Sequence, residues 1–518
     1  YRHRGDLARA ENNYREVLNA KRKALGDNHP EVADAIERLA NVLHSRGNLL
    51  EAETLYRQSL AMQQHFHQEP SIVVAHARFL LAQLYASWGR EQDAEPLWRA
   101  YLGDDYWGYS ARKSLESHLT QPALVPLVVD AQNAPALWHY TFAAPPTNWL
   151  AGSFDHSGWA SGAAPFGSLF YRPRSVWDLN ATNIWLRREF DLPVVPTTPL
   201  VFRAKYDDEV EIFVNGVKAA SGAYWTGGAY WLLPWSTEAR AALHTGRNVL
   251  AVHCLNREFD ACVDVGIYLA PDLRTGRLQL AGLLEQTQEY LRANVGLLAA
   301  RGHLLAQSGE WKAAAVEFNK AIEMEPTNHG LYLALGPLLV QSGDGERYNG
   351  FCERVLQRFT TTNDPIVAER MAKSCLLLAL PGPSQDAIAK MADAALAAGT
   401  NHWAFCYLQF CKGLSEYRQG RFENARRWMH EALTHTGEDA TRDVEAYMLL
   451  AMASHRLNQF DEARAAFTKG LGVAAASLPP RSSGNLGESW HDVLIADILT
   501  QEARSLIDSG LPSAKNSP

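Results

Sequence analysis

The stretch Gly47-Asn48-Leu49-Leu50-Glu51-Ala52-Glu53-Thr54-Leu55-Tyr56-Arg57-Gln58-Ser59-Leu60 carries a pattern that recurs every 42 residues in the N-terminal part of the chain. The equivalent positions are Gly5, Gly47 and Gly89; Ala10, Ala52 and Ala94; Glu11, Glu53 and Glu95; Tyr14, Tyr56 and Trp98; Leu18, Leu60 and Leu102. Alanine, aromatic residue and leucine are four residues apart, so they lie on one face of a helix that follows a turn at the glycine. The pattern predicts paired-helix solenoid repeats over residues 1–120.

A second set of repeats begins after about residue 285. Its best copy is Gly309-x-Trp311-x-x-Ala314-x-x-x-Phe318-x-x-Ala321-Ile322, and the skeleton returns from Gly420, more loosely from Asn458, and weakly over Gly343–Leu356 and Gly382–Ala395. Both sets resemble the tetratricopeptide repeat (TPR) family, and the 42-residue period of the first resembles its kinesin-light-chain-type variant. The resemblance implies α-helical TPR solenoids at residues 1–120 and 280–480, each with a groove for a protein or peptide partner.

Polar residues near Leu39 and Leu81 are the candidates for the groove of the first array. They are Arg38, Asn41, His44 and Gln83, and the apolar Leu80 lies beside them. Asn and Gln side chains can hydrogen-bond a peptide backbone, although such residues are also common on a solvated groove without a ligand. The paired Lys and Asn residues of the family's carboxylate clamp are not reproduced, so we do not expect binding of chaperone tails.

The region 124–271 has short alternating apolar runs bounded by proline and glycine, which is typical of β-strands. One run, Val210, Ile212 and Val214, ends at Asn215-Gly216, a dipeptide suited to a hairpin turn. At least six such runs predict a two-sheet β-sandwich or jelly roll.

The order of motifs in this region is also informative. Phe154-Asp155-His156-Ser157-Gly158-Trp159, Asn183–Phe190, Asp207–Gly216 and Gly246–His253 follow one another as in the galactose-binding-like jelly roll of β-galactosidase-type glycoside hydrolases. The sequence resembles that domain. Together with the two arrays, it resembles the C-terminal regions of large bacterial Ser/Thr protein kinases. The resemblance implies a non-enzymatic region of a bacterial signalling protein. Because the chain opens inside a repeat, we expect further residues upstream.

Aromatic residues between the expected strands form the second candidate site. Tyr224, Trp225, Tyr230, Trp231 and Trp235 could stack on a glycan, bind a partner, or attach the β-region to the neighbouring array. We expect domain attachment and keep carbohydrate binding as the alternative function.

No catalytic set of residues is expected. Asp207, Asp208, Glu209 and Glu211 suggest a glycosidase pair, but on one strand Asp208 would point away from the other three. No kinase phosphate loop, H-R-D or D-F-G motif occurs. Calcium bound by Asp155, Asp178 and Asp264 stays an alternative without supporting spacing, and no other metal or cofactor is expected.

Composition excludes several other classes. The 518 residues include 49 basic and 57 acidic ones, a net charge of −8, so we expect no nucleic-acid partner. The longest apolar stretch, 330–340, is about half of a membrane span. Six cysteines without a C-x-x-C pair fit a reducing compartment, which favours a bacterial cytoplasmic location without fixing it.

The C-terminal end should close the second array. Trp490, Leu494, Ile498 and Leu506 give residues 488–508 an apolar stripe, which predicts a cap helix. The tail, residues 512–518, is rich in Ser, Lys, Asn and Pro and is expected to be disordered. The sequence as a whole predicts three parts, a helical array, a β-sandwich and a helical array, acting as an interaction scaffold or sensor.

Overall fold

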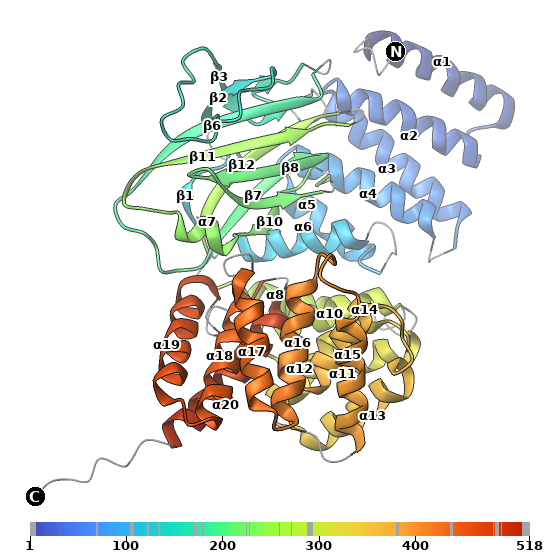
Figure 1. Cartoon of the computed structure of the whole chain (residues 1–518). Coiled ribbons are helices and arrows are strands. Elements are labelled where there is room, and N and C mark those ends of the chain that lie inside the picture. Colours follow the sequence, from blue (N-terminus) through green and yellow to red (C-terminus); the bar gives the residue numbers. More distant parts are fainter. Residues whose placement is uncertain are drawn as a thin grey trace, which may run out of the picture. The chain divides into compact units, whose positions relative to one another are not determined.

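The computed structural model describes residues 7–509 apart from residues 69–70, 104–107, 122–123, 133–134, 169–170, 172, 179–180, 224, 227, 258–259, 271, 287–293, 380–382, 436–438, 480, 482–485 and 488. Two compact units make up the chain, Tyr1–Asn294 and Val295–Pro518. The first unit holds the N-terminal helices and all the strands in Figure 1, and the second is helical.

The N-terminal helices form hairpins whose turns lie at the repeated glycines. Gly47 and Gly89 have φ of +79° and +76°, a conformation that glycine adopts without a steric penalty. Ala52 and Tyr56 are buried in the contact between helices, as the pattern predicts. The helices are α1 (Leu7–Leu25), α2 (Pro30–Ser45), α3 (Leu49–Phe66), α4 (Ile72–Ser87), α5 (Glu91–Ala100) and α6 (Gly108–Thr120).

A β-region with two sheets follows. Its strands are β1 (Val125–Val128), β2 (Ala136–Thr141), β3 (Ala160–Ala164), β4 (Phe166–Gly167), β5 (Ser175–Val176), β6 (Asn183–Leu192), β7 (Leu200–Asp207), β8 (Glu209–Val214), β9 (Val217–Gly222), β10 (Trp231–Pro234), β11 (Gly246–Leu255) and β12 (Cys262–Leu269), with the short helix α7 (Thr237–Ala241). One sheet has the order β10-β7-β12-β4-β5 with β1 paired to β12, and the other β3-β2-β6-β11-β8-β9. Apolar residues of both sheets, such as Phe202 and Ile212, share one core.

Two details test the strand predictions. Asn215 and Gly216 both have positive φ in the β8–β9 hairpin, which confirms the predicted turn. The expectation that Asp207 to Glu211 form one strand is wrong. Asp207 ends β7 and pairs with Cys262, whereas Glu209 begins β8 and pairs with Leu255 in the other sheet. The acidic run is therefore divided between two sheets.

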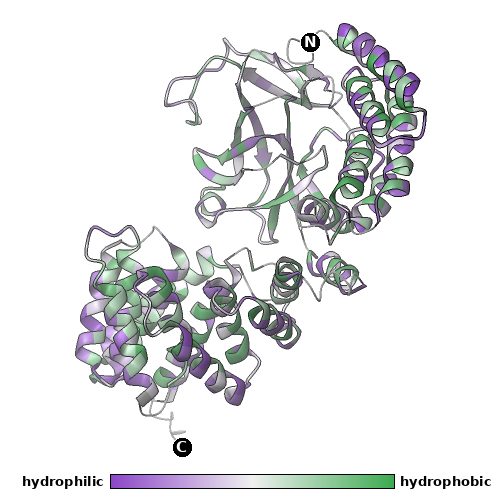
Figure 2. Cartoon of the chain, turned by 90° about the vertical axis from the view of Figure 1, so that its right-hand side faces the viewer, coloured by the Kyte–Doolittle hydropathy of each residue, from purple (hydrophilic) through white to green (hydrophobic). Residues whose placement is uncertain are grey.

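Helix α8 (Arg274–Gln286) belongs to the first unit. It packs on α6, and the buried Arg277 Nε donates to Glu116 Oε1 at 2.9 Å. The second array, expected from residue 280, therefore starts later in the described chain, at α10. Figure 2 shows the N-terminal helices curving along one side of the sheets, with hydrophilic and hydrophobic residues on each helix. None of the helices that the structure describes is both long and apolar enough to cross a membrane.

The described residues of the second unit form five helical hairpins and a further helix. The residues at the turns Gly309, Gly343, Gly420 and Asn458 have positive φ, while Gly382 lies outside the described residues. The helices are α10 (Val295–Gln307), α11 (Trp311–Met324), α12 (His329–Gln341), α13 (Gly345–Phe359), α14 (Pro365–Cys375), α15 (Pro383–Leu396), α16 (Phe405–Arg418), α17 (Phe422–Ala432), η4 (Leu433–His435), α18 (Ala440–Arg456), α19 (Phe460–Ser477) and α20 (Trp490–Ser509). Residues 512–518 of the expected tail are not among those described.

Candidate partner-binding surfaces

The predicted groove residues of α2 have different surroundings. Arg38 is exposed, and Asn41 is half-buried, with its Oδ1 accepting from Tyr56 Oη at 2.6 Å. His44 is buried, its Nε2 lies 2.8 Å from Ser87 Oγ, and its ring meets the Tyr56 ring edge-on. Of the three, Arg38 is therefore the one whose side chain is freely accessible.

On α4 the predicted residues face the β-region. Leu80 and Gln83 are buried, and a Cβ added at Gly228 would lie 3.5 Å from the Gln83 carbonyl oxygen. One turn earlier, the buried Phe79 ring is 5.5 Å from the Trp225 ring. The segment between β9 and β10 thus covers this part of α4, which leaves no open groove at Gln83.

The aromatic candidates also contact the chain itself. Tyr224 lies outside the described residues, and Trp225 is half-buried against Phe79. Trp231 is buried, its Nε1 donates to Ser114 Oγ of α6 at 3.3 Å, and its ring packs edge-on against Tyr109. Trp235 is half-buried and stacks on Phe202 at 4.5 Å. Tyr230 is 5% exposed and Trp231 3%, so neither offers a face to a sugar.

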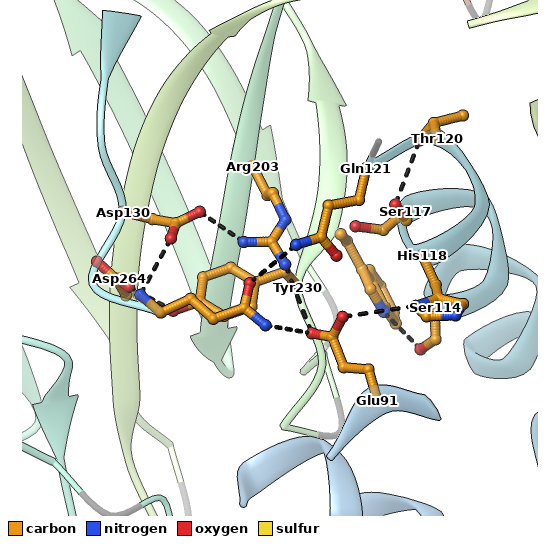
Figure 3. Close-up of polar contacts among 12 residues, drawn as sticks. Glu91, Ser114, Ser117, His118, Thr120, Gln121, Asp130, Arg203, Tyr230 and Asp264 are labelled. Atoms are coloured by element: carbon orange, nitrogen blue, oxygen red, sulfur yellow. Dashed lines mark hydrogen bonds and ion pairs between the residues drawn. The ribbon is translucent and has the colours of Figure 1, made fainter. Parts of the chain in front are cut away.

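A buried polar network joins the β7–β12 sheet to α5 and α6 (Figure 3). At its centre, the Arg203 guanidinium donates to Asp130 Oδ2 at 2.6 Å, lies 3.4 Å from Glu91 Oε1, and stacks 4.1 Å from the centre of the Tyr230 ring. Tyr230 Oη donates to Asp264 Oδ2 at 2.5 Å. A cation held by two carboxylates and a ring in a buried site fixes relative position, because each group needs the others to offset its desolvation.

The pKa values of two acids in this network, Asp264 and Glu91, are shifted in opposite directions. Burial, with the neighbouring Asp130 charge, raises the pKa of Asp264. Burial also acts to raise the pKa of Glu91, but hydrogen bonding to His118 and the Arg203 charge outweigh it, so this pKa lies below its usual range. Glu91 therefore remains charged opposite Arg203.

Sequence reasoning missed Arg203, Glu91 and Asp130. In β7 the apolar residues Phe202, Ala204 and Tyr206 mark the core face, so alternation places Arg203 and Lys205 on the other face, which usually meets water. The helical array covers that face, and both cations are buried. The sequence of a strand with charged residues on its outer face does not indicate that helices from another part of the chain bury that face.

The C-terminal unit presents a second candidate surface, which we call the α20 site. It consists of the first helix of every hairpin, α10, α12, α14, α16 and α18, where they surround α20. The helix lies at the predicted place in the sequence, but it is not confined to the end of the array as a cap would be. Its buried residues are Trp490, Val493, Leu494, Ile495, Ala496, Ile498, Leu499 and Ala503.

Charged residues of the α20 site meet acids of α20. Arg418 donates to both carboxylate oxygens of Glu502, at 2.5 and 2.7 Å. Lys373 Nζ lies 3.5 Å from Asp492 and 3.3 Å from Glu369. Burial raises the pKa of Glu369 and of the nearby Glu445, with Lys373 opposing both shifts. The basic residues of the site thus match the acids of the helix that occupies it.

Potential metal ligands lie apart from one another in the described part of the chain. Among the described residues, no three His, Cys, Asp or Glu side chains are grouped to hold a metal ion. Asp264 accepts from Tyr230 and from the Ala131 amide, and Asp155 accepts from the Ser157 amide in an exposed turn. The six cysteines are buried free thiols.

Comparison with known proteins identifies the repeats. The tetratricopeptide repeat family matches residues 1–65 and 35–102, and a second tetratricopeptide repeat profile matches residues 410–479. The chain therefore contains TPRs in both units, with a two-sheet β-region between the arrays. No curated protein matches the sequence.

Solved structures give only distant likenesses. The MamA protein is 16% identical over 35% of this chain and 91% of its own, with a TM-score of 0.24. Yeast Tom70 is 12% identical over 95% of this chain and 93% of its own, and Cut9–Hcn1 of the APC/C is 11% identical over 99% and 95%; both have a TM-score of 0.25. At such scores the assignment of the repeats rests on the family matches and on the helical hairpins.

Proposed function

We propose that the chain is a protein–protein interaction scaffold that has no catalytic activity of its own. The observation that supports this most is the α20 site, in which five successive first helices hold one 20-residue helix. A surface that binds a helix from Trp490 to Glu502 is suited to a helical segment of a partner protein. In the first unit, the exposed Arg38 on α2 is the predicted groove residue that remains open to a partner.

Photo-crosslinking tests this proposal. Benzoylphenylalanine would replace Arg38, the exposed Leu378 at the edge of the α20 site, or the exposed Arg427 on α17 as the matched control, each in the full chain. In a native extract we expect a defined crosslinked protein from Arg38 or Leu378 and none from Arg427. The captured protein would be identified and its binding reproduced with purified components. Equal crosslinking from all three positions, or from none, would contradict the proposal.

A finer proposal comes from the sequence resemblance. The order of first array, β-region and second array resembles the C-terminal regions of large bacterial Ser/Thr kinases, so we propose that this chain is the regulatory part of such a signalling protein. The gene sequence upstream of Tyr1 tests this: a Gly-rich loop, an H-R-D and a D-F-G motif are expected, and an upstream sequence lacking all three would refute it. The glycan alternative has weaker support, since Tyr230 and Trp231 are buried.

A further inference from the structure

We infer that α20 is an exchangeable occupant of the α20 site, and that the site binds a partner helix with the same chemistry. That helix would be strongly apolar, would begin with a tryptophan, and would carry acids at positions matching Asp492, Asp497 and Glu502. This inference rests on the proposed scaffold function and names the kind of partner. It is carried by how α20 is held, by how the site is prepared for it, and by the part of α20 that stays uncovered.

The N-terminal end of α20 is anchored by one aromatic ring. Trp490 is fully buried, and its Nε1 donates to His303 Nδ1 of α10 at 2.9 Å. Its ring lies 6.0 Å from the Phe318 ring of α11. Burial lowers the pKa of His303 to about 4, so the ring is neutral and its Nδ1 can accept the indole N–H. A buried indole with its N–H satisfied is typical of a binding anchor.

The opposite half of the site is prepared by the array itself. Arg418 also donates to the carbonyl oxygens of Leu376 and Leu377, both at 2.7 Å. The guanidinium is thus held in position by the array before any carboxylate arrives, and it can then bind Glu502 through two parallel hydrogen bonds. Asp497 also accepts from Gln341 Nε2 of α12 at 3.1 Å, and it pairs at 2.9 Å with Arg481, which belongs to the connection 478–489 and not to the array. Pre-positioned donors reduce the entropy cost of binding a helix.

The C-terminal half of α20 is only partly covered. Gln501, Arg504, Ser505 and Asp508 are exposed, and a surface cavity of about 260 Å³ lies beside the helix. The cavity is lined by Val340, Gln341 and Leu378 of the array and by Ile498, Gln501, Glu502 and Ser505 of α20. A helix that leaves space in its site and one side open can leave from that end without prior unfolding of the array.

The tether explains why α20 normally occupies the site. Residues 478–489 join α19 to α20, and a connection of this length gives the helix attached through it an effective concentration on the order of 1 mM. A free helix at about 10 μM would then be outcompeted roughly 100-fold unless it bound more tightly. Cutting the tether removes this advantage, so exchange should become visible.

The experiment uses the full chain with a specific protease site inserted into the connection 478–489. A fluorescent peptide with the sequence Ser489–Ser509 is added to the intact and to the cut protein, and binding is followed by anisotropy. We expect apparent affinity about 100-fold higher after cutting. A Glu502→Lys peptide should bind at least about 10-fold more weakly, because it loses the Arg418 contact. The matched control, Asp508→Lys, changes an exposed position and should bind like the native peptide.

Two outcomes would overturn the inference. If the cut protein keeps its helical circular dichroism but takes up no peptide, or if it loses helicity that the peptide does not restore, α20 is a permanent part of the core. Hydrogen exchange on the uncut chain gives a second measure: α20 amides should exchange at least about 10-fold faster than those of α18, and equal protection would contradict exchange of the helix. The peptide is the chain's own sequence, so failure here is distinct from failure to find a cellular partner.

Discussion

Glu37 on α2 is a carboxylic acid whose ionisation should be visible in stability. Burial, followed by the charge of Asp34, raises its pKa to about 7, while Arg38 opposes the shift. Its Oε1 lies 3.6 Å from His76 Nδ1, and burial lowers the pKa of His76. The unfolded carboxyl ionises near 4.5, so Glu37 makes the free energy of unfolding fall as pH rises from about 4.5 to about 7.

The Glu37→Gln variant should not show this fall in the free energy of unfolding as the pH rises. At about 1.4 kcal/mol per pKa unit, the variant should exceed the wild type in stability by about 3 to 4 kcal/mol at pH 8 and differ little at pH 4.5. His76 contributes with the opposite sign at low pH, and the comparison of variant with wild type cancels its effect to first order. Urea unfolding at both pH values measures this, with the exposed Glu16→Gln as control. Parallel pH profiles of wild type and Glu37→Gln would refute the assignment.

Arg203 should be among the most costly polar residues to remove. Arg203→Met keeps an apolar stem but leaves Asp130 and Glu91 buried without their cation, which we expect to cost about 3 to 5 kcal/mol. Tyr230→Phe loses one hydrogen bond to Asp264 and should cost about 1 to 2 kcal/mol. The control is Arg247→Met, which removes an exposed ion pair with Glu189 and should change stability little. Urea unfolding at pH 7 that ranks Arg247 with Arg203 would contradict the role of the network.

At the scale of single elements, turn glycines and helix glycines should respond oppositely to alanine. Gly89 has φ of +76° with open space around its Cβ position, so Gly89→Ala carries only backbone strain, about 1 kcal/mol of destabilisation. Gly282 lies within α8, also with open space, and Gly282→Ala should stabilise by about 0.5 to 1 kcal/mol. Thermal unfolding measures both. Shifts of the same sign would mean that the turn at Gly89 does not require glycine.

Local sequence patterns predicted the helices, strands and turns better than they predicted which of these elements lie side by side. The recurring Ala52 and Tyr56 fixed helix faces, and Asn215-Gly216 fixed a hairpin, because each depends on backbone geometry within a few residues. The break at Asp208, where the chain passes from one sheet to the other, has no such local signal. Of the predicted site residues, Arg38 is exposed whereas Gln83 and Trp231 are buried. Each of these two is buried by an element far away in the sequence, which a local pattern cannot indicate.

The surroundings of α20 were predicted only in part. Its apolar stripe of Trp490, Leu494 and Ile498 correctly indicates a helix that needs a partner surface. The adjacent Val493, Ile495 and Leu499 are buried as well, so the N-terminal half of α20 is apolar beyond that stripe and fits a surrounding site better than the end of an array. This distinction was present in the sequence, in the composition of all faces of the helix.

At the scale of the whole molecule, each array holds an element of its own chain. In the first unit, α4, α5 and α6 cover the outer face of the β7–β12 sheet, and in the second unit five hairpins surround α20. TPR arrays stabilise themselves mainly through neighbouring repeats, so a domain held this way adds contacts between residues far apart in sequence. We therefore expect the first array and the β-region to lose structure together.

Phe79→Ala tests that coupling. The ring is buried between Tyr101 and Trp225, so its loss should cost about 3 to 5 kcal/mol. If the array and sheet are coupled, hydrogen exchange should accelerate in β7, β10 and β12 as well as in α4 to α6. Leu137→Ala, at a 70% exposed position of β2, is the control and should leave exchange unchanged. Acceleration confined to the helices would show that the β-region keeps its structure without them, and that the buried Arg203 network attaches the array without stabilising the sheet.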